Sequence, residues 1–229
     1  VLQVRWNAIN RTEAYSRRYF MIYFDITEFG AKTPVQNSIL HPHDGQSNSM
    51  IAVVQDDGNI FTSKNNQDGT FGSLSLKGDV TTFGTDNSRS ISLGDFDGDL
   101  IEDAIIGSRY DNVGLVNNHS VYFCKGTGNL SFSTCGLIMN ISSTNANGYA
   151  MDSAVGYFNN DLHLDFAIST SNHLVDIFFG NGRGNFTKNA TLSVCASGVV
   201  ARGKDAADID GDGDTDIIVA CQNNPDMYR

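Results

Sequence analysis

The chain has few prolines, few cationic side chains and no long apolar run. Its 229 residues include 3 Pro, 1 Trp and 15 Lys and Arg together, against 26 Asp and Glu, so the net charge is −11. This deficit of positive charge argues against a nucleic-acid groove or an anionic-lipid surface, because both need Lys and Arg. Apolar runs such as 217–221 are far shorter than the roughly 20 residues that span a bilayer. We therefore expect no nucleic-acid partner and no membrane insertion.

The residues that are abundant indicate a folded protein rich in turns. Hydrophobic residues make up 40% of the chain, including 14 Phe and 8 Tyr, which is enough for a core and argues against disorder. Gly and Asn each occur 23 times, and few helix signals accompany them. The chain starts at Val1, so we expect that a leader was removed or that the sequence is part of a longer protein.

The four cysteines favour disulfides over a metal site. They form no Cys-x-x-Cys pair, and an even number fits two disulfides with three possible pairings. We favour Cys124–Cys135 and Cys195–Cys221, because the first pair brackets a segment in which the glycines of 126–128 permit a hairpin turn. Four buried free thiols are the alternative.

Asn-x-Ser/Thr sequons occur six times, a mild excess over chance. Together with the paired cysteines they favour an extracellular protein, secreted or at the cell surface. The candidate glycosylation sites are Asn10, Asn118, Asn129, Asn140, Asn185 and Asn189.

Acidic segments recur along the chain, each set in the same pattern of short apolar runs. The copies start at residues 42, 95, 157 and 208. A β-branched or aromatic run follows each copy, and the first three copies continue through a second run to a Gly-rich turn that ends in Phe. About four short antiparallel strands in each of about four repeats predict an all-β fold built from β-propeller blades. A β-sandwich is the alternative, but sandwiches do not repeat their sequence in this way.

Two of the copies carry aspartate at positions 1, 3, 5 and 9 of a loop. Calcium takes six to eight hard oxygens at about 2.3–2.6 Å, and alternate side chains of a tightly wound loop can point to one centre. A backbone carbonyl would serve at position 7, and glycine at position 4 permits a left-handed turn. The predicted calcium ligands are Asp95, Asp97, Asp99, Ile101 and Asp103 in one loop, and Asp208, Asp210, Asp212, Asp214 and Asp216 in the other.

This pattern fits calcium better than the alternatives. An EF-hand needs a Glu at position 12 and flanking helices, whereas Ile106 and Val219 stand there. Magnesium prefers to keep several waters, and transition metals favour Cys or His ligands. An acidic solvated turn remains, although four close carboxylates without a cation repel one another.

The other two copies have lost ligands. The loop that starts with Tyr157 keeps Asn159, Asp161 and Asp165, which make an incomplete metal set. The loop that starts with Pro42 has lost most of the set, and we expect no ion there.

These loops, with the Gly-x-Gly…Phe turns, resemble the FG-GAP/VCBS repeats, the calcium-bearing blades of integrin α-subunit propellers and related secreted propellers. The resemblance covers about 40–229 and implies that calcium rigidifies the loop between two strands of a blade. We therefore divide the chain into an N-terminal segment, 1–38, with strand-like runs at 1–6 and 19–26, and propeller repeats at 39–229. Rings of this kind have about six to eight blades, so about four repeats imply part of a larger ring.

Three classes of function remain open. The resemblance favours an extracellular scaffold that presents its loops to a protein partner. A lectin that binds glycans is the first alternative, with Trp6, Tyr110 and Tyr149 as candidate stacking residues, and a structural subunit that self-associates into a larger assembly is the second. We expect no enzyme, because the sequence has neither a nucleophile elbow nor an HExxH motif.

Overall fold

The computed structural model describes most of the chain from Val35 onward. The described residues are 35–42, 49–55, 58–64, 66, 68, 70–79, 88–108, 118–129, 131–142, 152–159, 161–171, 173–197, 199–212 and 214–222. The strand-like runs at 1–6 and 19–26 lie outside them.

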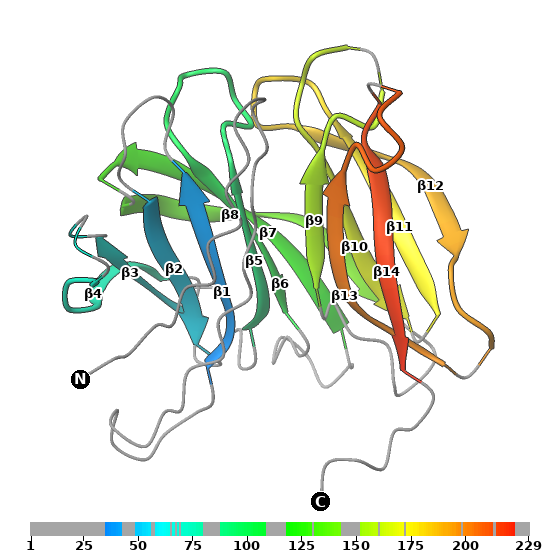
Figure 1. The fold of residues 1–229 in the computed structure, drawn as a ribbon, viewed down its shortest axis with the longest axis horizontal. Helices are drawn as coiled ribbons and strands as arrows, with labels where there is room; N and C mark the ends of the chain where they lie inside the picture. Colours follow the sequence, from blue (N-terminus) through cyan, green and yellow to red (C-terminus); the bar gives the residue numbers. More distant parts are fainter. Residues whose placement is uncertain are drawn as a thin grey trace, which may run out of the picture.

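The described residues form four antiparallel sheets and contain no helix (Figure 1). The first sheet holds β1 (Val35–Pro42), β2 (Ser49–Gln55), β3 (Asn59–Lys64) and β4 (Ser75–Asp79), and the second holds β5 (Ser88–Gly94), β6 (Asp103–Ser108), β7 (Asn118–Gly128) and β8 (Ser131–Ser142). The third holds β9 (Ser153–Gly156), β10 (Asp165–Ser171), β11 (Leu174–Gly180) and β12 (Phe186–Ser193), and the fourth holds β13 (Val200–Ala207) and β14 (Asp216–Gln222).

Each sheet is a meander in which consecutive strands are hydrogen-bonded neighbours. The prediction of an all-β fold built from four-stranded antiparallel units is thus confirmed in the first three sheets, while the ring and its blade number stay predictions. Strand β1 runs across the boundary that the sequence placed between residues 38 and 39.

The hairpin of the second sheet is longer than the short apolar runs indicated. Strands β7 and β8 have 11 and 12 residues, because Gly126 and Gly128 stay inside β7 at register shifts and do not end the strand. The turn falls instead at Asn129, whose φ of 52° is left-handed, a conformation that asparagine tolerates better than most residues.

Both predicted disulfides are present. Cys124 of β7 and Cys135 of β8 lie directly opposite each other, with Cα atoms 4.0 Å apart. Cys195, which follows β12, is joined to Cys221 of β14 at a Cα distance of 5.8 Å. The second bond therefore links the third sheet to the fourth covalently.

Apolar clusters between successive sheets form the core. Successive side chains of a strand point to opposite faces, so strand β6 contributes to two interfaces. Ala104 and Ile106 pack towards the first sheet, and Ile105 packs towards the third. In β10, Phe166 likewise faces the second sheet and Ala167 faces the fourth. The first strands also meet directly, since β5 contacts β1 and β9, and β9 contacts β13.

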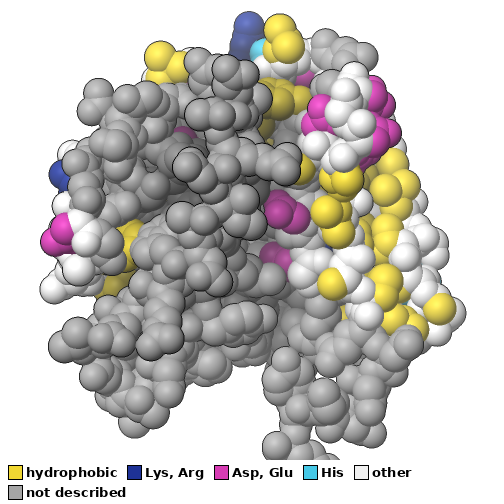
Figure 2. Space-filling model, in the orientation of Figure 1, with side chains coloured by type: hydrophobic (Ala, Val, Ile, Leu, Met, Phe, Trp, Pro, Cys, Tyr) yellow, Lys and Arg dark blue, Asp and Glu magenta, His cyan; other side chains and the backbone are white. Residues whose placement is uncertain are grey.

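The fourth sheet leaves one apolar face open in the described part of the chain. Phe96 and Phe158 stand at the second position of their loops; Phe96 is fully buried, and Phe158 packs against the cluster shared with the fourth sheet. Ile209 at the same position is 56% exposed, and Ile218 of β14 is 52% exposed. Figure 2 shows hydrophobic side chains gathered on this side of the molecule. The described residues contain no helix long and apolar enough to cross a membrane.

Candidate metal centre

Three acidic loops lie at one end of the sheets, the upper end in Figure 1. Each loop leaves the first strand of a sheet and enters the second: residues 95–102 connect β5 to β6, 157–164 connect β9 to β10, and 208–215 connect β13 to β14. The loop between β1 and β2, where we expect no ion, lies outside the described residues.

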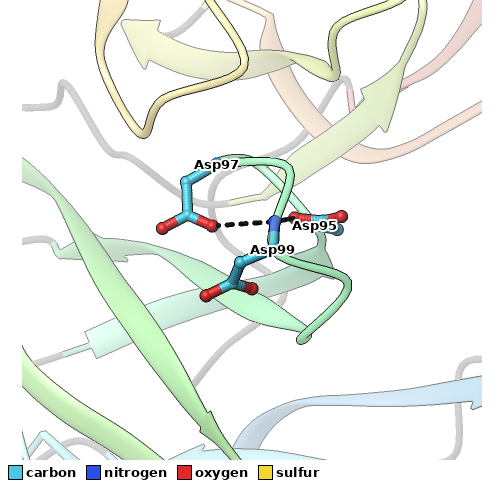
Figure 3. Close-up of side chains that lie close together, drawn as sticks. All are labelled: Asp95, Asp97 and Asp99. Atoms are coloured by element: carbon cyan, nitrogen blue, oxygen red, sulfur yellow. Dashed lines mark hydrogen bonds between the residues drawn. The ribbon is translucent and has the colours of Figure 1, made fainter.

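Loop 95–103 brings three carboxylates together (Figure 3). Asp95, Asp97 and Asp99 each offer an oxygen, and these oxygens lie within 4.8 Å of one another. Oxygens that each stand about 2.3–2.6 Å from one calcium ion are at most about 5 Å apart, so the spacing suits a single ion. The donors are all hard oxygens, and the group therefore fits calcium in chemistry as well as in spacing.

Asp103, the fourth predicted ligand, lies outside this group and holds the backbone. Its two oxygens accept hydrogen bonds from the N–H of Phe96 at 3.0 Å and of Gly126 at 2.7 Å, and the side chain is fully buried. Burial raises its pKa to about 6, helped by the charges of Asp97 and Asp99, while the two N–H donors oppose the shift. Asp103 thus ties loop 95–103 to strand β7.

Side chains within the loop fix its turns. Asp95 accepts hydrogen bonds from the N–H groups of Gly98 at 2.7 Å and Leu100 at 2.9 Å. Gly98 has a φ of 81° and Gly211, at the same position of loop 208–216, has a φ of 82°, as position 4 requires. Leu100 and Leu162 share a later left-handed position, with φ of 66° and 65°, where a leucine costs about 1–2 kcal/mol.

Loop 208–216 also groups three carboxylates, but a different three. Oxygens of Asp208, Asp210 and Asp216 lie within 4.8 Å of one another, while Asp212 lies outside the group. An oxygen of Asp212 accepts a hydrogen bond from the N–H of Asp214 at 2.9 Å. Figure 2 shows the carboxylates of this loop gathered at the upper right. Each loop therefore assembles three of its four predicted carboxylates, and the carbonyls of Ile101 and Asp214 stay predicted ligands.

Loop 157–165 keeps the same hydrogen bonds without the full ligand set. Asp165 accepts from the N–H groups of Phe158 at 2.8 Å and Gly180 at 2.9 Å, as Asp103 does in its own loop. Burial likewise raises the pKa of Asp165. Asn159 accepts a hydrogen bond from the N–H of Asp161 at 2.9 Å, and Asp161 accepts one from the N–H of His163. Position 1, however, is Tyr157, which offers no carboxylate.

A comparison with known families identifies this part of the chain. Residues 157–219 match the family model of the FG-GAP-like repeat. This segment is similar to an FG-GAP-like repeat. It runs from the β9–β10 loop to β14, and it contains both the incomplete loop 157–165 and the acidic loop 208–216. The resemblance inferred from the sequence for about 40–229 is thus confirmed over residues 157–219. No curated protein is significantly similar to the chain.

Two glycines of the repeats fix the loops to their sheets, a role that the Gly-rich turns of the sequence did not indicate. A Cβ on Gly126 would lie 2.2 Å from the carbonyl oxygen of Glu102, and one on Gly180 would lie 2.2 Å from that of Leu164. Both glycines also donate their N–H to the position-9 aspartate. In both repeats the glycine comes shortly after a pair of aromatic or apolar residues, and this repeated pattern is the feature of the sequence that could have revealed it.

Lys125 is a further residue of the site that the sequence did not reveal. Its ammonium group makes an ion pair with Asp97 and another, at 2.8 Å, with Asp99. The hydrogen bond from Lys125 lowers the pKa of Asp99, and the two aspartates raise the pKa of Lys125. The lysine comes from β7, far from the loop in sequence, so spacing within the loop could not indicate it.

The predicted glycosylation sites fall in several settings. Asn129, Asn185 and Asn189 are exposed, as glycosylation requires, whereas Asn10 lies outside the described residues. Asn118 and Asn140 lie in β7 and β8. All six stay predictions.

Proposed function

We propose that the chain is an extracellular, calcium-stabilised scaffold of the β-propeller type that binds a protein partner through its acidic loops. The recurrence of one loop design carries the proposal. Carboxylates gather in the loop after the first strand of the second sheet and in the loop after the first strand of the fourth sheet, and these are Asp95, Asp97 and Asp99 in one and Asp208, Asp210 and Asp216 in the other. The FG-GAP-like repeat supports calcium as the ion, since such repeats commonly bind it.

The packing of the sheets supports the propeller. In a propeller, four-stranded antiparallel blades are repeated around a centre, with the first strands innermost. Here the first strands β1, β5, β9 and β13 contact one another in succession, and each pair of neighbouring sheets shares an apolar cluster. Two disulfides support an extracellular location, because disulfides persist in oxidising compartments.

The same loops carry the side chains that would meet a partner. Leu100 is 83% exposed and Leu162 is 86% exposed, and both sit among carboxylates at strained left-handed positions. Ile209 and Tyr157 are further exposed apolar residues on these loops. An apolar surface rimmed by acidic groups suits a protein partner that presents apolar side chains flanked by Lys or Arg.

The calcium part of the proposal is tested by heating the protein with and without chelator. With micromolar affinity and millimolar calcium, each ion would add about 4 kcal/mol, so chelation should lower the melting temperature by many degrees. A melting temperature that is indifferent to chelator would reject calcium stabilisation. A glycan array tests the lectin alternative, whose candidate residues Trp6, Tyr110 and Tyr149 lie outside the described residues.

The open face of the fourth sheet favours the self-associating assembly as a second proposal. Ile209 and Ile218 occupy a surface that the next sheet covers in the second and third sheets, and a second copy of the chain would cover it here. Sedimentation of the chain should show an oligomer that Ile218→Asp dissociates. A folded monomer at high concentration would count against this assembly, but it would not bear on the proposal that the loops bind calcium. We expect no catalysis, and this expectation stays a prediction.

A further inference from the structure

Lys125 is held in place over loop 95–103 from both sides. The preceding residue, Cys124, is fully buried and bonded to Cys135, and the following residue, Gly126, donates its N–H to Asp103. Lys125 itself is 47% exposed, whereas Asp97 is 12% and Asp99 is 33% exposed. The backbone on both sides of Lys125 is therefore held in place, and the ammonium group lies against the carboxylates of Asp97 and Asp99.

The ammonium group binds the carboxylate oxygens that the backbone leaves available. In Asp97, Oδ1 accepts the N–H of Asp99 at 3.3 Å and Oδ2 is paired with Lys125. In Asp99, Oδ1 accepts the N–H of Ile101 at 2.9 Å and Oδ2 is paired with Lys125 at 2.8 Å. A calcium ion liganded by these Oδ2 atoms would stand within a few ångströms of a positive charge.

When the second and third sheets are compared, a lysine stands next to the loop only where that loop carries the grouped carboxylates. Gly126 and Gly180 make the same contacts to their loops, so Phe179 of β11 is the residue equivalent to Lys125. Phe179 packs against an apolar cluster, and its loop has Asn159 in place of Asp97 and Tyr157 in place of Asp95. Within the described part of the chain the fourth sheet has only two strands, so loop 208–216 has no counterpart of β7 there.

We infer that Lys125 is an internal cation that competes with calcium for loop 95–103. Without calcium its single positive charge offsets one of the two negative charges of Asp97 and Asp99 and helps to keep the loop folded. When calcium binds, the ammonium group leaves these oxygens, so the loop binds calcium more weakly than its carboxylates alone would allow. The inference rests on the proposed calcium function and assigns unequal regulation to its two sites.

Calorimetric titration with calcium chloride in single-site variants tests this inference. In an Asp210→Ala background, which retains loop 95–103, Lys125→Met should raise calcium affinity about five- to tenfold, as removal of a half-exposed charge near the ion implies. Lys125→Arg retains the charge and should retain the weaker affinity. In an Asp97→Ala background, which retains loop 208–216, Lys125→Met should leave calcium affinity unchanged.

Lys188→Met is the matched control. Lys188 is also about half exposed, and its ammonium group pairs with a buried carboxylate, Asp176, at 2.6 Å, but away from the acidic loops. This variant should leave calcium affinity unchanged in both backgrounds.

A second measurement separates competition from a simple stabilising ion pair. Without calcium, Lys125→Met should lower the melting temperature, because Asp97 and Asp99 lose their counter-charge. With increasing calcium, the loss should shrink towards zero, because the ammonium group no longer pairs with these oxygens when calcium is bound. A loss that is the same at every calcium concentration would overturn the competition, as would equal affinities of the two proteins in the Asp210→Ala background. Absence of calcium binding in every variant would instead reject the proposed calcium function, and the inference with it.

Discussion

Loops 95–103 and 157–165 have the same backbone but different ligands. In both, the position-9 aspartate accepts one N–H from its own loop and one from a glycine of the next strand. In both, the residue at position 3 accepts the N–H of the residue at position 5. They differ at position 1, where Asp95 contributes an oxygen to the grouped carboxylates and Tyr157 cannot. Side-chain to backbone hydrogen bonds thus shape the loop. The loops also differ at position 3, where Asn159 replaces Asp97, and we propose that position 1 decides whether an ion can bind.

The largest effect is expected from removing the position-9 carboxylate in either loop. Asp103→Ala and Asp165→Ala each leave two N–H groups without their acceptor in a buried setting, which costs about 3 kcal/mol. Urea unfolding with chelator present at pH 7 measures the loss in the absence of calcium. Both variants should lose similar stability, because the hydrogen bonds and not the ion are removed.

Asp68→Ala is the control for these two variants. Asp68 also accepts a backbone N–H, from Thr70 at 2.9 Å, but in an exposed turn, so its loss should cost less than about 1 kcal/mol. If Asp165→Ala were as mild as Asp68→Ala, the common hydrogen-bond design of the two loops would be wrong.

A gain of calcium binding in loop 157–165 would sharpen the comparison further. Tyr157→Asp supplies the missing position-1 carboxylate, and adding Asn159→Asp completes the set at position 3. We expect the double variant to bind one calcium ion more than the wild type, weakly, and Tyr157→Ala to bind none more. Equilibrium dialysis against calcium counts the ions. An unchanged count in the double variant would show that position 1 does not decide ion binding.

A pH-dependent effect is expected from buried polar groups that shape the fold without an ion. The backbone N–H of Lys204 in β13 donates to the carboxylate of Asp152 at 2.6 Å, and its ammonium group donates to the Asp152 carbonyl at 3.1 Å. Burial lowers the pKa of Lys204 to about 8 from its usual 10.5, and the nearby charge of Asp152 opposes the shift.

Between pH 8 and pH 10.5 the unfolded chain holds more protons at Lys204 than the folded protein does, so stability rises with pH. The stability of the wild type relative to Lys204→Met should therefore increase from pH 8 to pH 10.5, with or without calcium. Urea unfolding at these pH values is the measurement, and a difference that does not change with pH would refute the burial argument.

Local features of the sequence predicted much of the fold. Apart from the Cys195–Cys221 bond, contacts between segments far apart in the sequence could not be predicted from it. The strands on both sides of each acidic loop follow from apolar runs, and the left-handed Gly98 and Gly211 follow from their places in the loop. The Cys124–Cys135 bond follows from the hairpin that the pair brackets. Such features depend on residues within a few positions of one another.

Spacing alone assigned four equivalent aspartates to each loop. The structure separates Asp103 from the others, because its partner Gly126 comes from another strand. Lys125 reaches Asp97 and Asp99 from the same strand. These roles require the register of β7 against β6, which the pattern of residues does not specify.

The number of bound calcium ions is the most direct test of the proposal that loops 95–103 and 208–216 each bind one. Calorimetric titration of the chelated protein measures this number. We predict two ions for the wild type, one each for Asp97→Ala and Asp210→Ala, and two for Asp161→Ala, since loop 157–165 lacks the position-1 carboxylate. A stoichiometry of zero in the wild type would contradict the calcium-binding role of both loops. An ion lost on Asp161→Ala would contradict the distinction between the loops.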